Sequence, residues 1–119
     1  GTYDGIFLAP THPVVSEFLG ARTILNCKTC QPVGNGLVRV NTGKISLLVP
    51  DEERPVRKIA IPAHHVYLSR ERPPGPDVNR FSGIIEAVTS ERFLARFIIR
   101  ISGEKIIAEM PEKEAKERG

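Results

Sequence analysis

The sequence predicts an all-β fold made of short antiparallel strands. Its 119 residues include 10 glycines and 10 prolines, a high density of residues that turn or end regular elements. Aromatic residues make up only 6% of the chain, while 40% of the residues are hydrophobic, which is enough for a core. Between the glycines and prolines lie short runs in which hydrophobic and polar residues alternate, the period of a strand with one buried face.

The first half of the chain contains several such runs. A turn at Asn41, Thr42 and Gly43 favours positive φ and predicts a hairpin between the runs on either side of it. Pro62 is expected to end a later run, because proline cannot donate to a sheet ladder. A loop is expected over residues 31–36. Strands are expected over residues 22–27, 37–40, 44–49, 56–61 and 64–69.

The second half is predicted to be an antiparallel meander of three strands, over residues 81–88, 93–101 and 104–110. Ser102 and Gly103 form the tight turn between the last two. Arg96 and Arg100 fall on one face of the middle strand, where a solvated surface is the preferred interpretation. The alternate residues of that strand are expected to face the core, namely Phe93, Ala95, Phe97, Ile99 and Ile101.

A proline-rich stretch over residues 70–78 excludes regular structure and divides the chain. Near the N-terminus, Thr11 is a suitable N-cap and Gly20 a suitable stop for a short helix. The polar residues after Pro111 are expected to form a helical tail. The predicted organisation is a linker helix over 1–20, a first β subdomain over 21–69, the connection over 70–78, and a second, incomplete β subdomain over 79–119.

Composition excludes several function classes. The net charge of +3 comes without the dense basic face and interleaved aromatic residues of a nucleic-acid-binding domain. No hydrophobic run approaches the roughly 20 residues that span a bilayer. Walker, GxSxG and HExxH motifs are missing from the sequence, so this chain itself is expected not to be an enzyme.

The two cysteines, Cys27 and Cys30, supply half of a tetrahedral zinc site. His64 and His65 could complete such a site, but adjacent residues of a strand point to opposite faces. Structural or incidental thiols are therefore the preferred interpretation, with a metal site or a disulfide as the alternative.

Two segments of the chain resemble the ATP-binding subunits of ABC importers. The first, over residues 5–25, resembles the junction that follows their nucleotide-binding domain. The second, His65 to Pro73 and then Asn79 to Gly83, is similar to the ATPases of molybdate and tungstate importers. From Gly5 to about Pro111, the chain thus looks like the C-terminal regulatory domain of these subunits, the transport-associated OB (TOBE) domain. The matching junction residues are Ile6, Pro10, Val15, Phe18, Leu19 and Gly20.

This resemblance implies an OB-like (TOBE/MOP-like) β-barrel with a short N-terminal helix, in which Val15, Phe18 and Leu19 pack the linker against the barrel. It implies that ATP and magnesium bind to the nucleotide-binding domain of a parent chain, and that this chain holds no cofactor. The implied partners are that domain, a second copy in a homodimer, and the membrane subunits of the transporter. The implied location is cytoplasmic and peripheral to the membrane.

The resemblance also implies a binding site for the transported oxyanion, with Asn79, Arg80, Ser82 and Gly83 as candidates. Backbone N–H groups, hydroxyls and a cation suit a tetrahedral dianion. Relatives usually have Ser and Arg where this chain has Pro76 and Val78, and Asp77 adds a repelling charge. Turn and barrel-rim roles are therefore the competing interpretation of the four candidates.

Three alternatives remain beside the oxyanion-type importer domain. The chain could be the regulatory domain of a sugar (maltose-like) importer ATPase. It could be a freestanding OB module that binds anions or oligonucleotides, for which basic groove residues and surface aromatics would be expected. It could also be a dimerisation module that no longer binds an anion.

Overall fold

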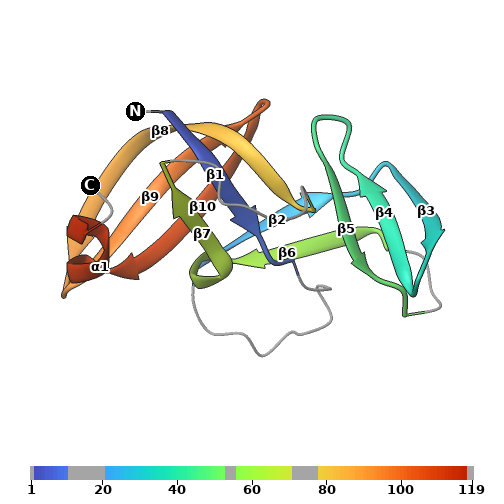
Figure 1. Ribbon diagram of the computed structural model, residues 1–119, viewed down its shortest axis with the longest axis horizontal. Coiled ribbons are helices and arrows are strands. Elements are labelled where there is room, and N and C mark those ends of the chain that lie inside the picture. The colour runs from blue at the N-terminus through green and yellow to red at the C-terminus, as the bar shows by residue number, and fades with distance from the viewer. Residues whose placement is uncertain (1, 11–20, 53–55, 71–77, 118–119) are drawn as a thin grey trace.

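The computed structural model describes residues 2–10, 21–52, 56–70 and 78–117 (Figure 1). These residues form strands, one 3₁₀ turn and one short helix, as the all-β prediction requires. The elements are β1 (Thr2–Leu8), β2 (Arg22–Asn26), β3 (Thr29–Gly34), β4 (Leu37–Asn41), β5 (Ser46–Pro50), β6 (Lys58–Pro62), the 3₁₀ turn (Ala63–His65), β7 (Val66–Ser69), β8 (Arg80–Glu91), β9 (Leu94–Ile101), β10 (Glu104–Pro111) and α1 (Glu112–Glu117).

The strands form three antiparallel sheets. The largest has the order β10-β9-β8-β1-β7, and the others are the pair β2-β6 and the three-stranded sheet β3-β4-β5. In Figure 1, β8, β9 and β10 curve together on one side of the molecule, while β3, β4 and β5 lie at the opposite end. Within the described part of the chain the large sheet is open, with β10 and β7 as its outer strands.

One hydrophobic core joins the three sheets. It takes Ile6 and Ile99 from the large sheet, Ile59 from the two-stranded sheet, and Val40 and Val49 from the three-stranded sheet, all with no exposed surface. Strand periodicity explains this selection, because alternate residues of each strand point to the same face. The described residues therefore share one core rather than two.

The meander prediction is confirmed for β8, β9 and β10, which pair antiparallel in sequence order. Ala95, Phe97, Ile99 and Ile101 are buried as expected. The expectation for Phe93 is wrong, because this residue lies in the turn before β9 with a φ of 67° and is 87% exposed.

The predicted hairpin is also confirmed, since β4 and β5 pair antiparallel. Its turn is held by local hydrogen bonds: the Gly43 amide donates to Asn41 Oδ1 at 2.6 Å, and the Ile45 amide donates to Thr42 Oγ1 at 3.2 Å. Gly43 has a φ of 94°, a value that strongly favours glycine.

Two local predictions in the first half are wrong. Most of the expected loop over 31–36 belongs to β3, and only Asn35 and Gly36 form the two-residue turn to β4. Pro32 is tolerated there because β3 is an edge strand. His64 and His65 lie in the 3₁₀ turn rather than in a strand, which brings their rings edge to face at 4.3 Å instead of onto opposite faces.

The predicted organisation of the N-terminal segment is wrong for residues 2–8. These residues form β1, which lies between β7 and β8 in the large sheet, whereas a linker helix was expected over 1–20. Burial of Tyr3, Ile6 and Leu8 provides the apolar face that holds the strand in place. The helix expected over 11–20, with Val15, Phe18 and Leu19, lies outside the described residues.

The proposed border at 70–78 does not separate two sheets. β7 precedes it and β8 follows it, yet both pair with β1. At the C-terminus the helical tail is confirmed as α1, whose first turn carries Glu112 and Glu114, the charge that a helix N-terminus favours. No helix in the described ranges is both long and apolar enough to cross a bilayer.

Candidate functional site

Asn79 connects three strands at the start of β8. Its side-chain Oδ1 accepts a hydrogen bond from the Leu48 amide at 2.7 Å, and its Nδ2 donates to the Leu48 carbonyl at 2.9 Å. Its own carbonyl accepts from the Leu8 amide at 3.0 Å. The φ of 53° is a left-handed value that asparagine adopts more readily than most residues. The Asn79 side-chain amide therefore bonds to the amide and the carbonyl of Leu48 on β5, as the backbone of a neighbouring strand would.

Ser82 and Gly83 serve the contact between β8 and β1. The Ser82 hydroxyl donates to Asp4 Oδ1 at 2.8 Å. Gly83 is buried, and a Cβ atom there would lie 2.7 Å from Ile6 Cδ1 and 2.8 Å from the Arg100 carbonyl oxygen. Glycine is required because any Cβ atom would collide with the Ile6 side chain and with the backbone of β9.

Arg80 lies opposite Phe7 in the β1–β8 register and is half-buried. The four predicted oxyanion residues are thus consecutive or nearly so along β8, but they do not converge on one point. Asn79 faces β5, Ser82 bonds to an acidic side chain on β1, and Gly83 lies in the core. A dianion bonded to Ser82 would lie beside the Asp4 carboxylate, which would repel it.

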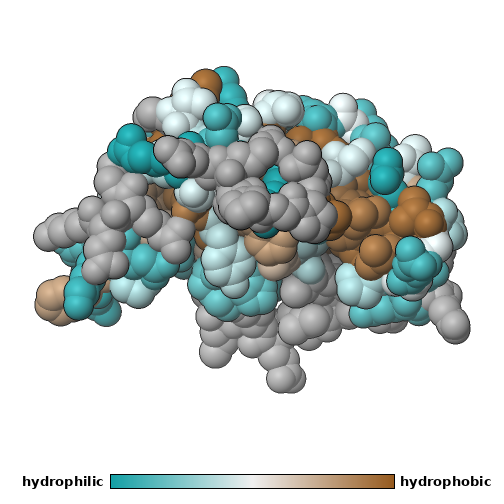
Figure 2. Space-filling model, in the orientation of Figure 1, coloured by the Kyte–Doolittle hydropathy of each residue, from teal (hydrophilic) through white to brown (hydrophobic). Residues whose placement is uncertain are grey.

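A hollow of about 300 Å³ lies beside Asn79, and sequence reasoning missed it. Arg39 on β4 and Ser46 on β5 line it together with the 78–79 turn. Within the described part of the chain, the Arg39 guanidinium takes part in no ion pair, and its side chain is exposed. The feature of the sequence that could have pointed to Arg39 is an arginine on the outward face of β4, a strand of mostly hydrophobic residues. Leu47, Leu48 and Val78 also line the hollow, and Figure 2 shows hydrophobic surface over the region of β4 and β5.

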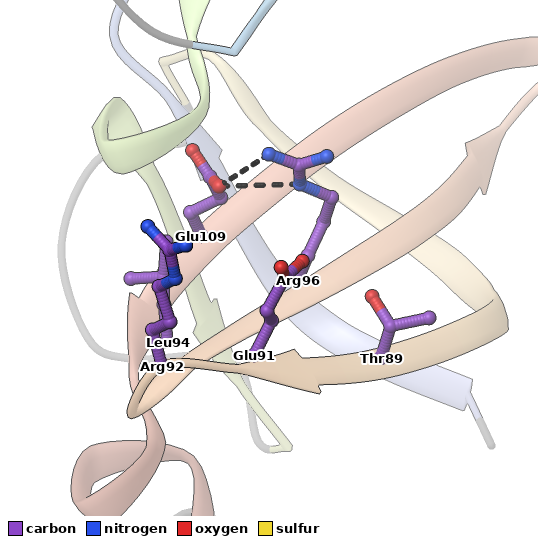
Figure 3. Close-up of a pocket in the computed structure, with 6 residues that line it drawn as sticks. All are labelled: Thr89, Glu91, Arg92, Leu94, Arg96 and Glu109. Atoms are coloured by element: carbon purple, nitrogen blue, oxygen red, sulfur yellow. Dashed lines mark hydrogen bonds and ion pairs between the residues drawn. The ribbon is translucent and has the colours of Figure 1, made fainter.

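A second hollow of about 300 Å³ lies on the outward face of the β8–β9 hairpin (Figure 3). Arg96 donates to Glu109 Oε2 from Nε at 3.1 Å and from Nη2 at 2.8 Å, as the dashed lines show. Arg100 forms a similar pair with Glu86 at 2.7 Å. The predicted basic row is therefore a row of surface ion pairs, which contribute about 0–1 kcal/mol each.

The turn between β8 and β9 is unusual for its residue types. Arg92 and Phe93 have φ values of 53° and 67°, the left-handed pair that a two-residue hairpin turn requires. The turn between β3 and β4 meets this requirement with Asn35 and Gly36. A left-handed conformation costs a residue other than glycine or asparagine on the order of 1 kcal/mol. The Glu112 amide donates to the Phe93 carbonyl at 2.7 Å and helps to hold this turn.

The cysteines do not form a metal site with other residues in the described ranges, where no group of three potential ligands occurs. Cys27 and Cys30 are both free thiols and partly buried. Burial, and to a lesser extent the neighbouring Cys30, raises the pKa of Cys27. Cys27 is therefore mostly protonated at neutral pH and is a poor nucleophile.

His65 has a buried Nδ1 atom without a hydrogen-bond partner among the described residues. Its carbonyl oxygen accepts from the Ala9 amide at 3.2 Å, so the 3₁₀ turn extends the contact between β7 and the end of β1. This arrangement explains the position of the histidine backbone, and nothing in the structure assigns a role to the ring.

Comparison of the chain with protein-family models, with curated proteins and with solved structures finds no match.

Proposed function

We propose that this chain is the regulatory and dimerisation domain of the ATP-binding subunit of an ABC importer, with molybdate or tungstate as the transported solute. One observation carries the proposal. The segments that resemble the importer subunits are far apart in sequence, but their described parts at residues 5–8, 66–69 and 80–83 lie in the adjacent strands β1, β7 and β8. Ile6 lies opposite Leu68 on one side and Phe81 on the other. These parts of the two segments therefore belong to one sheet.

In this proposal the three sheets are parts of an OB-like (TOBE/MOP-like) barrel. The shared core supports it, because residues of all three sheets pack together as the wall of a small barrel would. The Asn79 side chain also supports it, since it links β5 of one sheet to the start of β8 in another. Such links make the domain a stiff body that can transmit the separation of two attached ATPase domains.

The regulatory role follows from this stiffness. Two copies that meet through these domains would favour one spacing of the ATPases, and a ligand that prefers that spacing would shift the population towards it. ATP and magnesium would bind in the nucleotide-binding domain of the parent chain. The membrane subunits would hold the assembly at the cytoplasmic face of the membrane.

Oxyanion sensing is the second part of the proposal, and the hollow beside Asn79 favours it. Arg39 offers a guanidinium and Ser46 a hydroxyl, the donors that a tetrahedral dianion needs. Asn79 lines the hollow and holds β5 in place there, whereas Ser82 and Gly83 serve the contact of β8 with β1 and do not line it.

Calorimetric titration of the 119-residue chain with molybdate, tungstate and sulfate tests the sensing role. We expect heat with molybdate or tungstate, and an affinity about tenfold or more lower in Arg39→Gln, because a charge-assisted hydrogen bond contributes about 1.5–3 kcal/mol. Arg57→Gln is the matched control, an exposed arginine away from the hollow, and should bind like the wild type. If the folded wild-type chain binds none of the three anions, sensing is excluded and dimerisation alone remains.

A further inference from the structure

Within the described ranges, one edge of β8 pairs with no strand over residues 85–91. β9 pairs with β8 along its length, but β1 pairs with the opposite edge only from Arg80 to Ile84. Figure 1 shows β8 continuing past the start of β1 towards the helix α1. Among the described residues, no strand pairs with this side over seven consecutive positions, of which every other one directs its backbone N–H and C=O groups to this edge.

Three other strand edges among the described residues are protected against pairing with another chain. β3 carries Pro32, β7 has only 4 residues, and β5 is covered at Leu48 by both polar atoms of the Asn79 amide. The free part of β8 contains no proline or lysine. Of its two acidic residues, Glu86 is neutralised by Arg100 at 2.7 Å. Bare strand edges usually carry such protection. Here it is limited to Glu91 and to a bulge between Ile85 and Ala87, so residues 87–90 form an unprotected stretch, which favours a partner strand.

The same edge exposes hydrophobic side chains. Val88 lies opposite Phe97 in the β8–β9 register, so it points to the core face of the sheet, yet it is 55% exposed whereas Phe97 is 7% exposed. Ile84 is 54% exposed at one end of the free edge, and Phe93 is 87% exposed at the other. Figure 2 shows hydrophobic surface at the protruding tip where Figure 1 places the β8–β9 turn.

We infer that a second copy of the chain pairs antiparallel with this edge, β8 against β8, about a two-fold axis at Val88. Val88 is the central residue of the free stretch, so this register fills the edge in both copies at once. It places the two Val88 side chains opposite each other on the core face, where each would cover the other.

Charge supports this register. Glu86 of one copy lies opposite Ser90 of the other, whereas a slip by one residue in one of the two directions would place Glu86 opposite Glu91, a repulsive pair. Arg92 of the second copy falls diagonal to Glu86, within reach of a long side chain. In this register, Phe93 of the second copy lies beside the exposed Ile84 of the first. This contact would offset the backbone strain of placing phenylalanine in a left-handed turn.

The inference rests on the proposed function for its biological context, a domain attached to paired ATPases, and it specifies which surface the two copies share. It is tested on the full 119-residue chain with Cys27 and Cys30 replaced by serine. In this background, Val88→Cys should form a disulfide-linked dimer under mild oxidation, because residues paired across a two-fold axis have Cα atoms about 4.5–5.5 Å apart. Val33→Cys is the matched control, since Val33 is 45% exposed on the edge strand β3, and should not form a disulfide-linked dimer.

Light scattering of two further variants completes the test. Val88→Lys should weaken the dimer by about tenfold or more, because it places two like charges at the axis. Phe93→Gly should raise the unfolding midpoint of the monomer while it weakens the dimer, since glycine removes the backbone strain together with the contact. A wild-type monomer, or a dimer that Val88→Cys does not cross-link faster than Val33→Cys, would overturn the inference. A dimer formed elsewhere on the surface would leave the proposed function intact.

Discussion

Gly83→Val is expected to lower the free energy of unfolding by about 3 kcal/mol, the upper part of the usual range for overpacking a core. The first added carbon would lie 2.7 Å from Ile6 Cδ1, 2.8 Å from the Arg100 carbonyl oxygen and 3.0 Å from Ile101 Cγ1. The Ile6 side chain could move, but the Arg100 carbonyl belongs to the backbone of β9. Urea unfolding followed by circular dichroism measures the change.

Ser82→Val provides the control for Gly83→Val. Ser82 is exposed on the same strand, and its hydroxyl bond to Asp4 is at the surface. Its loss should therefore cost no more than about 1 kcal/mol. A Gly83→Val protein as stable as the wild type would contradict the close packing of β8 between β1 and β9.

Asn79→Ala is expected to lower the free energy of unfolding by about 2–3 kcal/mol. The substitution removes two hydrogen bonds and leaves the amide and carbonyl of Leu48 unpaired in a partly buried place, at a cost of about 1 kcal/mol or more for each. Alanine also fits the φ of 53° less well than asparagine does. Chemical denaturation of both proteins gives the difference.

Two further variants separate the causes of this loss. Asn79→Gly removes the amide but tolerates the left-handed backbone, so it should be less destabilised than Asn79→Ala by on the order of 1 kcal/mol. Asn79→Asp keeps the acceptor for the Leu48 amide but not the donor for its carbonyl, so it should fall between wild type and Asn79→Ala. If all three variants were as stable as the wild type, Asn79 would be free to serve a ligand instead of the fold.

The strand pattern made much of the fold predictable. Alternation from Ala95 to Ile101 identified the buried face of β9, and Gly43 identified the β4–β5 turn. Phe93 shows the limit of predicting from alternation. It continues the alternating series but lies in a turn whose positive φ values are unusual for arginine and phenylalanine. Periodicity reports which side a strand residue faces, and it cannot say where the strand begins.

The N-terminal strand could not be predicted from local signals. The residues around Ile6 resembled the end of a helical linker, and their conformation depends on pairing with β7 and β8 from distant parts of the chain. The resemblance singled out Asn79 and Gly83 as candidates for binding an oxyanion. Their use is evident only in three dimensions, where Asn79 meets β5 and Gly83 meets Ile6. Arg39 was missed for the same reason, because its proximity to the 78–79 turn exists only in the folded chain.

These observations lead to one account of the molecule. The motif from Asn79 to Gly83 fixes β8 against both β1 and β5, and the free half of β8 then projects as a surface for a second copy. Arg39 and Ser46 provide the place where an anion could bias that assembly. Each part fits a regulatory domain carried by a transporter ATPase.

The coding sequence upstream of the Gly1 codon tests the transporter assignment most directly. The account predicts that sequencing the genomic DNA there will find the same reading frame running back through an ABC signature motif and a Walker A motif, G-x-x-x-x-G-K-[ST]. A frame that closes before such motifs, or that encodes an unrelated domain, would contradict the assignment.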